Sequence, residues 1–159
     1  MSLVINTDPK VYDGAWKEFQ SGVNALIRPY TRQMVRKVMA LATVSGPPAA
    51  EGIPPTESHV DPLLWDKHLY REIIGDISGL IDPDKKPVEI NKSEPDTDGV
   101  VRTLRNVAAI DAVCDQVDGF AAWALAESKA LAAAITATRE AQTKNLKRSH
   151  GGKQTGQKD

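Results

Sequence analysis

The sequence predicts a mainly α-helical protein, a small helical domain with one or two short β-hairpins and a long C-terminal helix. All ten prolines lie at or before Pro95, whereas residues 108–141 contain thirteen alanines and no proline. Proline interrupts the helical hydrogen-bond ladder, and alanine has the highest helix propensity. Apolar residues also recur at helical spacing. We therefore expect short elements in the first part of the chain and long helix in the second.

The size of the chain fits one domain. With 159 residues, 41% of them hydrophobic, it can bury a substantial core. We expect a single mainly helical domain over residues 1–146. Beyond Lys144 the composition changes to Lys, Arg, Gly, Gln and Ser, which predicts a disordered basic tail over residues 147–159.

The first elements are predicted by turn and capping residues. Residues 16–28 form two short extended runs around Gln20-Ser21-Gly22, which predicts a β-hairpin. Arg28-Pro29 ends the second strand, because proline cannot donate to a ladder. Thr31 then caps a helix that runs to about Ala42. Its apolar stripe contains Met34, Val35, Val38, Met39 and Leu41.

The middle of the chain contains a loop, a helix and a turn. Residues 43–60 contain two Pro-Pro pairs and predict a long, proline-rich surface loop. Asp61-Pro62 begins a second helix, and Gly75 ends it. Ile77–Ile81 and Val88–Ile90 flank a turn, which predicts a second short hairpin or a hooked turn. The buried side of the helix is expected to contain Leu63, Leu64, Leu69, Tyr70, Ile73 and Ile74.

Two further helices are expected in the last part. Thr97 is a suitable cap for a helix over about Asp98–Arg105, with a break near Asn106. The following apolar residues step by four and three, which keeps one stripe on one helix face for about six turns. This stripe contains Val113, Val117, Phe120, Ala124, Ser128, Leu131 and Ile135, with Trp123 at its border.

The sequence contains no constellation typical of an enzyme. Ser45-Gly46 is followed by prolines rather than by a helix, and no glycine-rich nucleotide-binding loop occurs. Cys114 lacks a nearby base that would hold a thiolate. His59 and His68 stand near aspartates, but Asp61 is already explained as a helix cap. We therefore expect no catalytic, cofactor or metal site.

Charge and cysteine content limit the partners and the compartment. The formal net charge is -1, so no global field attracts nucleic acid, and the basic tail lacks aromatic residues that would stack on bases. A single cysteine and the lack of a leader at Met1 favour a cytosolic protein. No apolar run reaches the roughly 20 residues of a membrane span. Neither nucleic acid nor a membrane is expected as a partner.

Two runs resemble a known family. Phe19, Ser21-Gly22-Val23 and Ile27-Arg28-Pro29-Tyr30-Thr31 resemble the opening of the tail assembly chaperones of tailed bacteriophages. The run from Ile73 to Val88 is similar to a second family segment, in which a helix leads into a turn and a capped helix. Ile77 stands where the family often has tryptophan, and Lys85-Lys86 replaces an Asp-Gly-like turn. The resemblance covers about residues 16–131, without the proline-rich loop.

The resemblance implies a function in virion assembly. Such chaperones hold the long, helix-prone tape measure protein soluble in the host cytoplasm while tail tube subunits gather, and they are absent from the mature virion. The implied partners are the tape measure protein and the tail tube protein, and self-association is a further expectation. The alternative is a small structural or adaptor protein of the phage tail.

The candidate partner-binding residues lie on the long helix. An amphipathic helix that shields an apolar helical partner needs a complementary apolar face. The candidates are Phe120, Trp123, Leu131 and Ile135. The same residues also fit an internal core, and of the four, Trp123 and Leu131 are expected to be partly exposed.

Overall fold

The computed structural model describes residues 13–20, 22–46, 51–52 and 57–150, with only the backbone for residues 147–150. The described part is 49% helical and 27% strand, in four helices and three small antiparallel sheets. The fold is therefore mixed α/β, and the expected mainly α class is wrong. Two of the sheets have only two strands, and short polar strands carry little alternating signal in the sequence.

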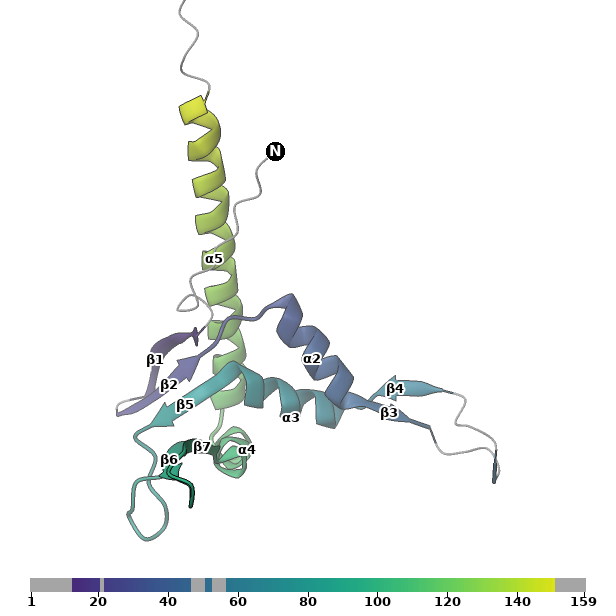
Figure 1. Ribbon diagram of the computed structural model, residues 1–159, viewed down its shortest axis with the longest axis vertical. Helices are drawn as coiled ribbons and strands as arrows, with labels where there is room; N and C mark the ends of the chain where they lie inside the picture. Colours follow the sequence, from purple (N-terminus) through teal and green to yellow (C-terminus); the bar gives the residue numbers. More distant parts are fainter. Residues whose placement is uncertain (1–12, 21, 47–50, 53–56, 151–159) are drawn as a thin grey trace, which may run out of the picture.

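A three-stranded sheet lies at the centre of the fold. It contains β1 (Ala15–Gln20), β2 (Val23–Ile27) and β5 (Ile74–Ser78) in the order β1-β2-β5 (Figure 1). The predicted first hairpin is confirmed, since β1 and β2 pair in antiparallel fashion. The other edge of β2 pairs with β5. Of the two alternatives for the next turn, the hooked turn is observed, because only Ile81 and Pro87 form a bridge.

Helices α2 (Arg32–Ala42) and α3 (Pro62–Ile73) begin at the predicted caps. The Thr31 hydroxyl accepts a hydrogen bond from the Met34 amide at 3.2 Å. The Asp61 carboxylate accepts from the first amides of α3, at 2.8 and 3.1 Å. At its other end α3 continues directly into β5, so Gly75 lies in the strand and does not end the helix.

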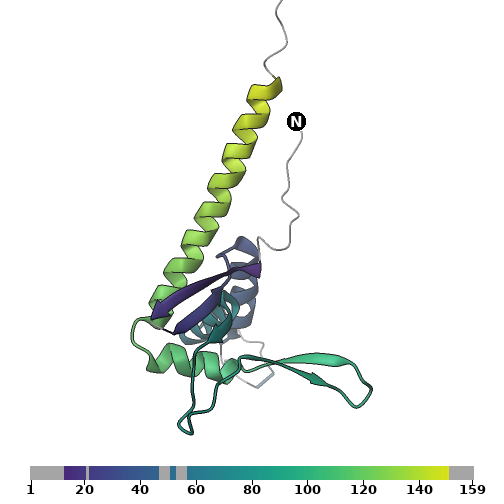
Figure 2. The ribbon, with the colours of Figure 1, turned by 90° about the vertical axis from the view of Figure 1, so that its left-hand side faces the viewer.

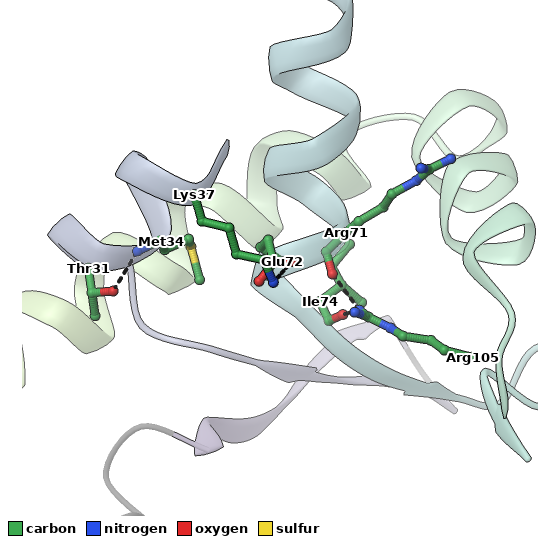
Figure 3. A network of polar contacts seen from close by, with 7 residues as sticks. All are labelled: Thr31, Met34, Lys37, Arg71, Glu72, Ile74 and Arg105. Carbon is green, nitrogen blue, oxygen red and sulfur yellow. Dashed lines mark hydrogen bonds and ion pairs between the residues drawn. The ribbon is translucent and has the colours of Figure 1, made fainter. Parts of the chain in front are cut away.

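Polar contacts join the end of α3 to its neighbours (Figure 3). Lys37 of α2 pairs with Glu72 of α3 at 2.6 Å. The guanidinium of Arg105 donates to the carbonyls of Arg71 and Ile74, which the end of the helix leaves without partners. Burial and the charge of Arg28 lower the pKa of Arg105. By these hydrogen bonds Arg105 holds its own segment of the chain against the end of α3.

The proline-rich segment contains regular structure at its ends. β3 (Thr43–Ser45) pairs with β4 (Ser58–Val60), so the expected continuous loop over 43–60 is wrong there. The four prolines of this segment lie between the two strands in the sequence and fall outside the described residues.

The helix expected over 98–105 is also wrong. β6 (Asn91–Pro95) and β7 (Val101–Arg105) form an antiparallel hairpin that projects from the body (Figure 2). The turn between them is closed by a hydrogen bond from the Gly99 amide to the Asp96 carbonyl, and Gly99 has φ +75°. Only glycine adopts this left-handed conformation without strain.

The C-terminal helical region is divided in two. α4 (Val107–Gln116) is capped by Asn106, and α5 (Phe120–His150) begins after a turn at Gly119, whose φ is +78°. The expected single stripe from Val113 to Ile135 is therefore wrong, because the helix axis changes direction at this turn. The backbone of α5 continues to His150, so the tail expected from residue 147 begins as helix, while residues 151–159 lie outside the described residues.

The core lies between the sheet and the first half of α5, with α2, α3 and α4 beside it (Figures 1 and 2). Its largest fully buried side chains are Phe120, Ile27, Ile73, Ile74, Ile90, Ile110 and Val38. Met39, Leu41 and Leu63 were expected on buried helix faces and are exposed. The second half of α5 extends away from the body.

Candidate partner-binding site

The predicted binding residues of α5 lie at different depths. Phe120 is fully buried and meets Phe19 of β1 edge to face, with ring centroids 5.2 Å apart. Trp123 is half-buried, and its ring centroid lies 5.1 Å from that of Phe19. Aromatic pairs at this separation stabilise a core beyond their buried area. Phe120 therefore has no surface to offer a partner.

The other two candidates lie further along α5. Leu131 is half-buried and packs against the core, and Ile135 is half-buried one turn later. From Thr136 to Leu146 the side chains are exposed. The structure thus brings Phe120, Trp123 and Leu131 together at the core, and it leaves Ile135 where the helix departs from the body.

A second surface, which the sequence analysis missed, is a groove of about 430 Å³ between α3 and α4. We call it the α3–α4 groove. One wall consists of α3 residues at positions i, i+3, i+4 and i+7, and the other consists of α4 residues with the start of α5. The lining residues are Leu63, Asp66, Lys67, Tyr70, Asp111, Cys114, Asp115 and Ala121.

Leu63 is the most exposed large apolar side chain of this groove, at 81%. Its helical spacing to Tyr70 suggested a shared buried face. That face also carries Asp66 and Lys67, which mark it as open to water. This mixture of charged and apolar residues was the feature of the sequence that could have predicted an exposed face.

An ion pair between the walls fixes the groove. The Arg71 guanidinium donates two hydrogen bonds to the Asp111 carboxylate, one of them 2.8 Å long, and Lys67 lies 3.7 Å from the same group. The hydrogen bond from Arg71 holds the pKa of Asp111 below its usual range. Two-point pairing of this kind fixes orientation as well as distance. The ion pair therefore fixes the position and orientation of α3 relative to α4.

The lining of the groove disfavours additional negative charge. Burial, and then Asp111 and Asp115, raise the pKa of the Cys114 thiol to about 12. Burial, followed by Asp66 and Cys114, raises the pKa of Tyr70. Cys114 is therefore protonated at neutral pH, which opposes a role as a nucleophile.

Within the described ranges, no group of three or more His, Cys, Asp or Glu side chains could hold a metal ion. In that same part of the chain, no helix is long and apolar enough to cross a membrane. The described surface includes a groove lined by apolar and charged side chains, a projecting helix and projecting hairpins. These arrangements are suited to contact with another macromolecule.

Comparisons of the chain with protein-family models, with curated proteins and with solved structures found no match.

Proposed function

We propose that this protein is a tail assembly chaperone of a tailed bacteriophage, which binds the tape measure protein and keeps it soluble during tail assembly. In this proposal the protein acts in the host cytoplasm, catalyses no reaction and leaves before the virion is complete. The tail tube protein is a second proposed partner. The resemblance of residues 16–31 and 73–88 to that family supports the proposal.

The observation that carries the proposal is the α3–α4 groove. A chaperone for a helix-prone client must offer an apolar surface that a helix can cover. Leu63 and Tyr70 line the groove from one wall, Ala121 lines it at the start of α5, and Leu63 is largely unprotected from water. A groove between two helices with apolar side chains on its walls offers a surface on which a partner helix can pack.

Co-expression with the candidate tape measure protein tests the proposal. The fraction of soluble tape measure protein is measured with the unchanged chain, with Leu63→Ser and with Ile81→Ser. Ile81 is a matched control, because it is also exposed and apolar but lies outside the groove. We expect the unchanged chain and the control to keep the client soluble, and Leu63→Ser to do so less. Equal client solubility without the chain would rule the proposal out.

A structural protein of the tail is the second candidate, favoured by the β6–β7 hairpin. This hairpin projects from the body and exposes Val100, Val101 and Leu104, as expected for a subunit that inserts into a neighbour (Figure 2). Mass spectrometry of purified virions separates the two candidates. Abundant copies in mature particles would favour the structural protein, and absence from them would favour the chaperone.

A further inference from the structure

The α3–α4 groove carries negative charge on both walls. Asp111 is neutralised by Arg71 and Lys67. Asp66 on α3 and Asp115 on α4 are both exposed, and neither has an ion-pair partner among the residues that the structure describes. Each wall therefore presents one carboxylate that a partner could neutralise.

The surface between these carboxylates is apolar, with Leu63 exposed and Tyr70 and Cys114 half-buried. Leu63, Tyr70 and Cys114 line it, and burial is the first cause of the raised pKa values of both Tyr70 and Cys114. A negative charge placed here would be repelled by Asp66 and Asp115, although water around these exposed carboxylates weakens the repulsion. A positive charge at the rim would be favoured for the same reason.

We infer that the α3–α4 groove binds an amphipathic helix whose apolar face is flanked by lysine or arginine. The apolar side chains of that helix cover Leu63 and Tyr70, and its basic side chains pair with Asp66 and Asp115. The inference deepens the proposed function and rests on it only in assigning the helix to the tape measure protein.

The shape of the groove fits this partner. Its walls are two helices, and a third helix can lie against such a pair by the usual packing of ridges into grooves, at an axis separation of about 8–10 Å. A volume of about 430 Å³ has room for a few apolar side chains. An acidic helix would place like charges opposite Asp66 and Asp115 and would be rejected.

Cys114 provides a direct reporter of occupancy. It is the single cysteine of the chain and lines the groove. The raised pKa of Cys114 leaves little thiolate at pH 8.5, so alkylation by excess iodoacetamide is slow, and intact mass spectrometry over several hours measures its rate. A helix seated in the groove should slow this reaction.

The probe is a synthetic 18-residue helical peptide of Leu, Ala and Lys, with Leu at i, i+3, i+4 and i+7 and Lys on both flanks. A second peptide carries Glu at every Lys position. We expect the Lys peptide to bind one to one by calorimetry, to slow the alkylation of Cys114 and to bind more weakly as salt is raised. Equal binding of both peptides, or alkylation unchanged by the Lys peptide, would overturn the inference.

The double variant Asp66→Asn with Asp115→Asn tests the two carboxylates. Binding of the Lys peptide should weaken by about three- to tenfold, as expected for two partly exposed ion pairs. The control is Asp84→Asn with Asp98→Asn, the same change of charge at exposed positions outside the groove, and its affinity should stay unchanged. A double variant that binds as the control does would contradict the assigned pairs.

A second copy of the chain is the competing occupant. Sedimentation analysis over a range of concentrations, together with alkylation of Cys114, addresses it. If Cys114 becomes more protected as the chain self-associates in the absence of peptide, the groove is an interface between two copies of the chain and the inference is wrong. A monomer in which the alkylation rate of Cys114 does not change with protein concentration supports a groove that is open to another chain.

The outcomes separate this inference from the proposed function. If the tape measure protein needs the chain for solubility and the double variant still keeps it soluble, the ion pairs assigned to Asp66 and Asp115 are wrong, and the proposed chaperone function stands. If the Lys peptide protects Cys114 while the tape measure protein is soluble without the chain, helix binding in the groove is supported and the proposed chaperone function is wrong.

Discussion

Ser128 links the last helix to the first sheet. Its side chain is fully buried, and its hydroxyl donates a 2.6 Å hydrogen bond to the Arg28 carbonyl just beyond β2. The Ser128 carbonyl in turn accepts from the Tyr30 amide at 3.1 Å. A partly buried carbonyl that loses its donor costs free energy unless water replaces the lost bond.

Replacing Ser128 with alanine should lower the free energy of unfolding by about 1–2 kcal/mol, since the hydrogen bond to Arg28 is lost. Urea denaturation measures the change. Thr138→Ala is the control, because its hydroxyl bonds to the Ala134 carbonyl on an exposed part of the same helix, and its stability should hardly change. If the two variants are equally stable, the contact of Ser128 contributes nothing.

The Arg71–Asp111 pair makes stability depend on pH. The folded pKa of Asp111 lies below its ordinary value of 3.8, chiefly because Arg71 donates to it. Its stabilising effect is therefore complete above the ordinary value and is lost as the pH falls through the lowered folded value.

Asp111→Asn should destabilise the protein at pH 7 by about 1–2 kcal/mol, because one partner of a charge-assisted bond is removed. Between pH 5 and pH 2, roughly, the unchanged protein should lose more stability than the variant does. Thermal unfolding across this range measures both slopes. Parallel stability curves would show that Asp111 titrates alike in the folded and unfolded chains.

A substitution of Trp123 tests whether this half-buried candidate residue belongs to the core or binds a partner. Its ring packs against Phe19 and against Phe120, the latter at 5.5 Å, so we expect Trp123→Ala to cost about 3–5 kcal/mol. Thermal unfolding and client binding are measured on the same sample. A melting curve that hardly moves, with weaker client binding, would instead make Trp123 a partner anchor.

At the scale of elements, glycines in left-handed conformations occupy two turns, one after β5 and one between β6 and β7. Gly79 has φ +86°, and a Cβ atom there would lie 1.8 Å from the Gly22 carbonyl oxygen of the neighbouring turn. Gly99 has a similar φ, but its Cβ would meet open space. The two positions separate backbone strain from steric clash.

Gly99→Ala should cost about 1 kcal/mol, the strain of the left-handed conformation alone. Gly79→Ala should cost clearly more, because the β1–β2 turn must also move. The melting temperatures of both variants measure the difference. Equal losses would show that the turn at Gly22 adjusts freely.

Some elements could be predicted because their signals are local. Thr31 and Asp61 cap their helices by bonds to amides two or three residues away, so the sequence contains the whole interaction. The β6–β7 hairpin could not be predicted in this way. Thr97 resembles a helix cap, whereas the partner of the β-branched run at Val100 and Val101 is the polar strand β6, which shows no alternation.

At the scale of the whole molecule, the groove could not be predicted because it forms between elements about forty residues apart. Arg71 meets Asp111 only after α3 and α4 pack, and no local pattern encodes that pairing. The α5 residues were identifiable as one apolar stripe. Whether Phe120 faces a partner or the core depends on β1, which lies at the other end of the described chain.

Ending the chain after Lys147 should leave the fold unchanged, because the removed residues include no large apolar side chain. The thermal unfolding curves of the full and shortened chains should coincide. A drop of several degrees in the melting temperature would show that the removed residues pack on the body.

The bond between Ser128 and Arg28 spans 100 residues of sequence. On the ribosome, β1 and β2 therefore emerge long before the helix that covers them. Until α5 is synthesised, Phe19 and Ile27 lack their packing partners, and the nascent chain exposes apolar surface that favours aggregation. Folding is completed late in translation, because the contacts that close the core are among the most distant in the chain.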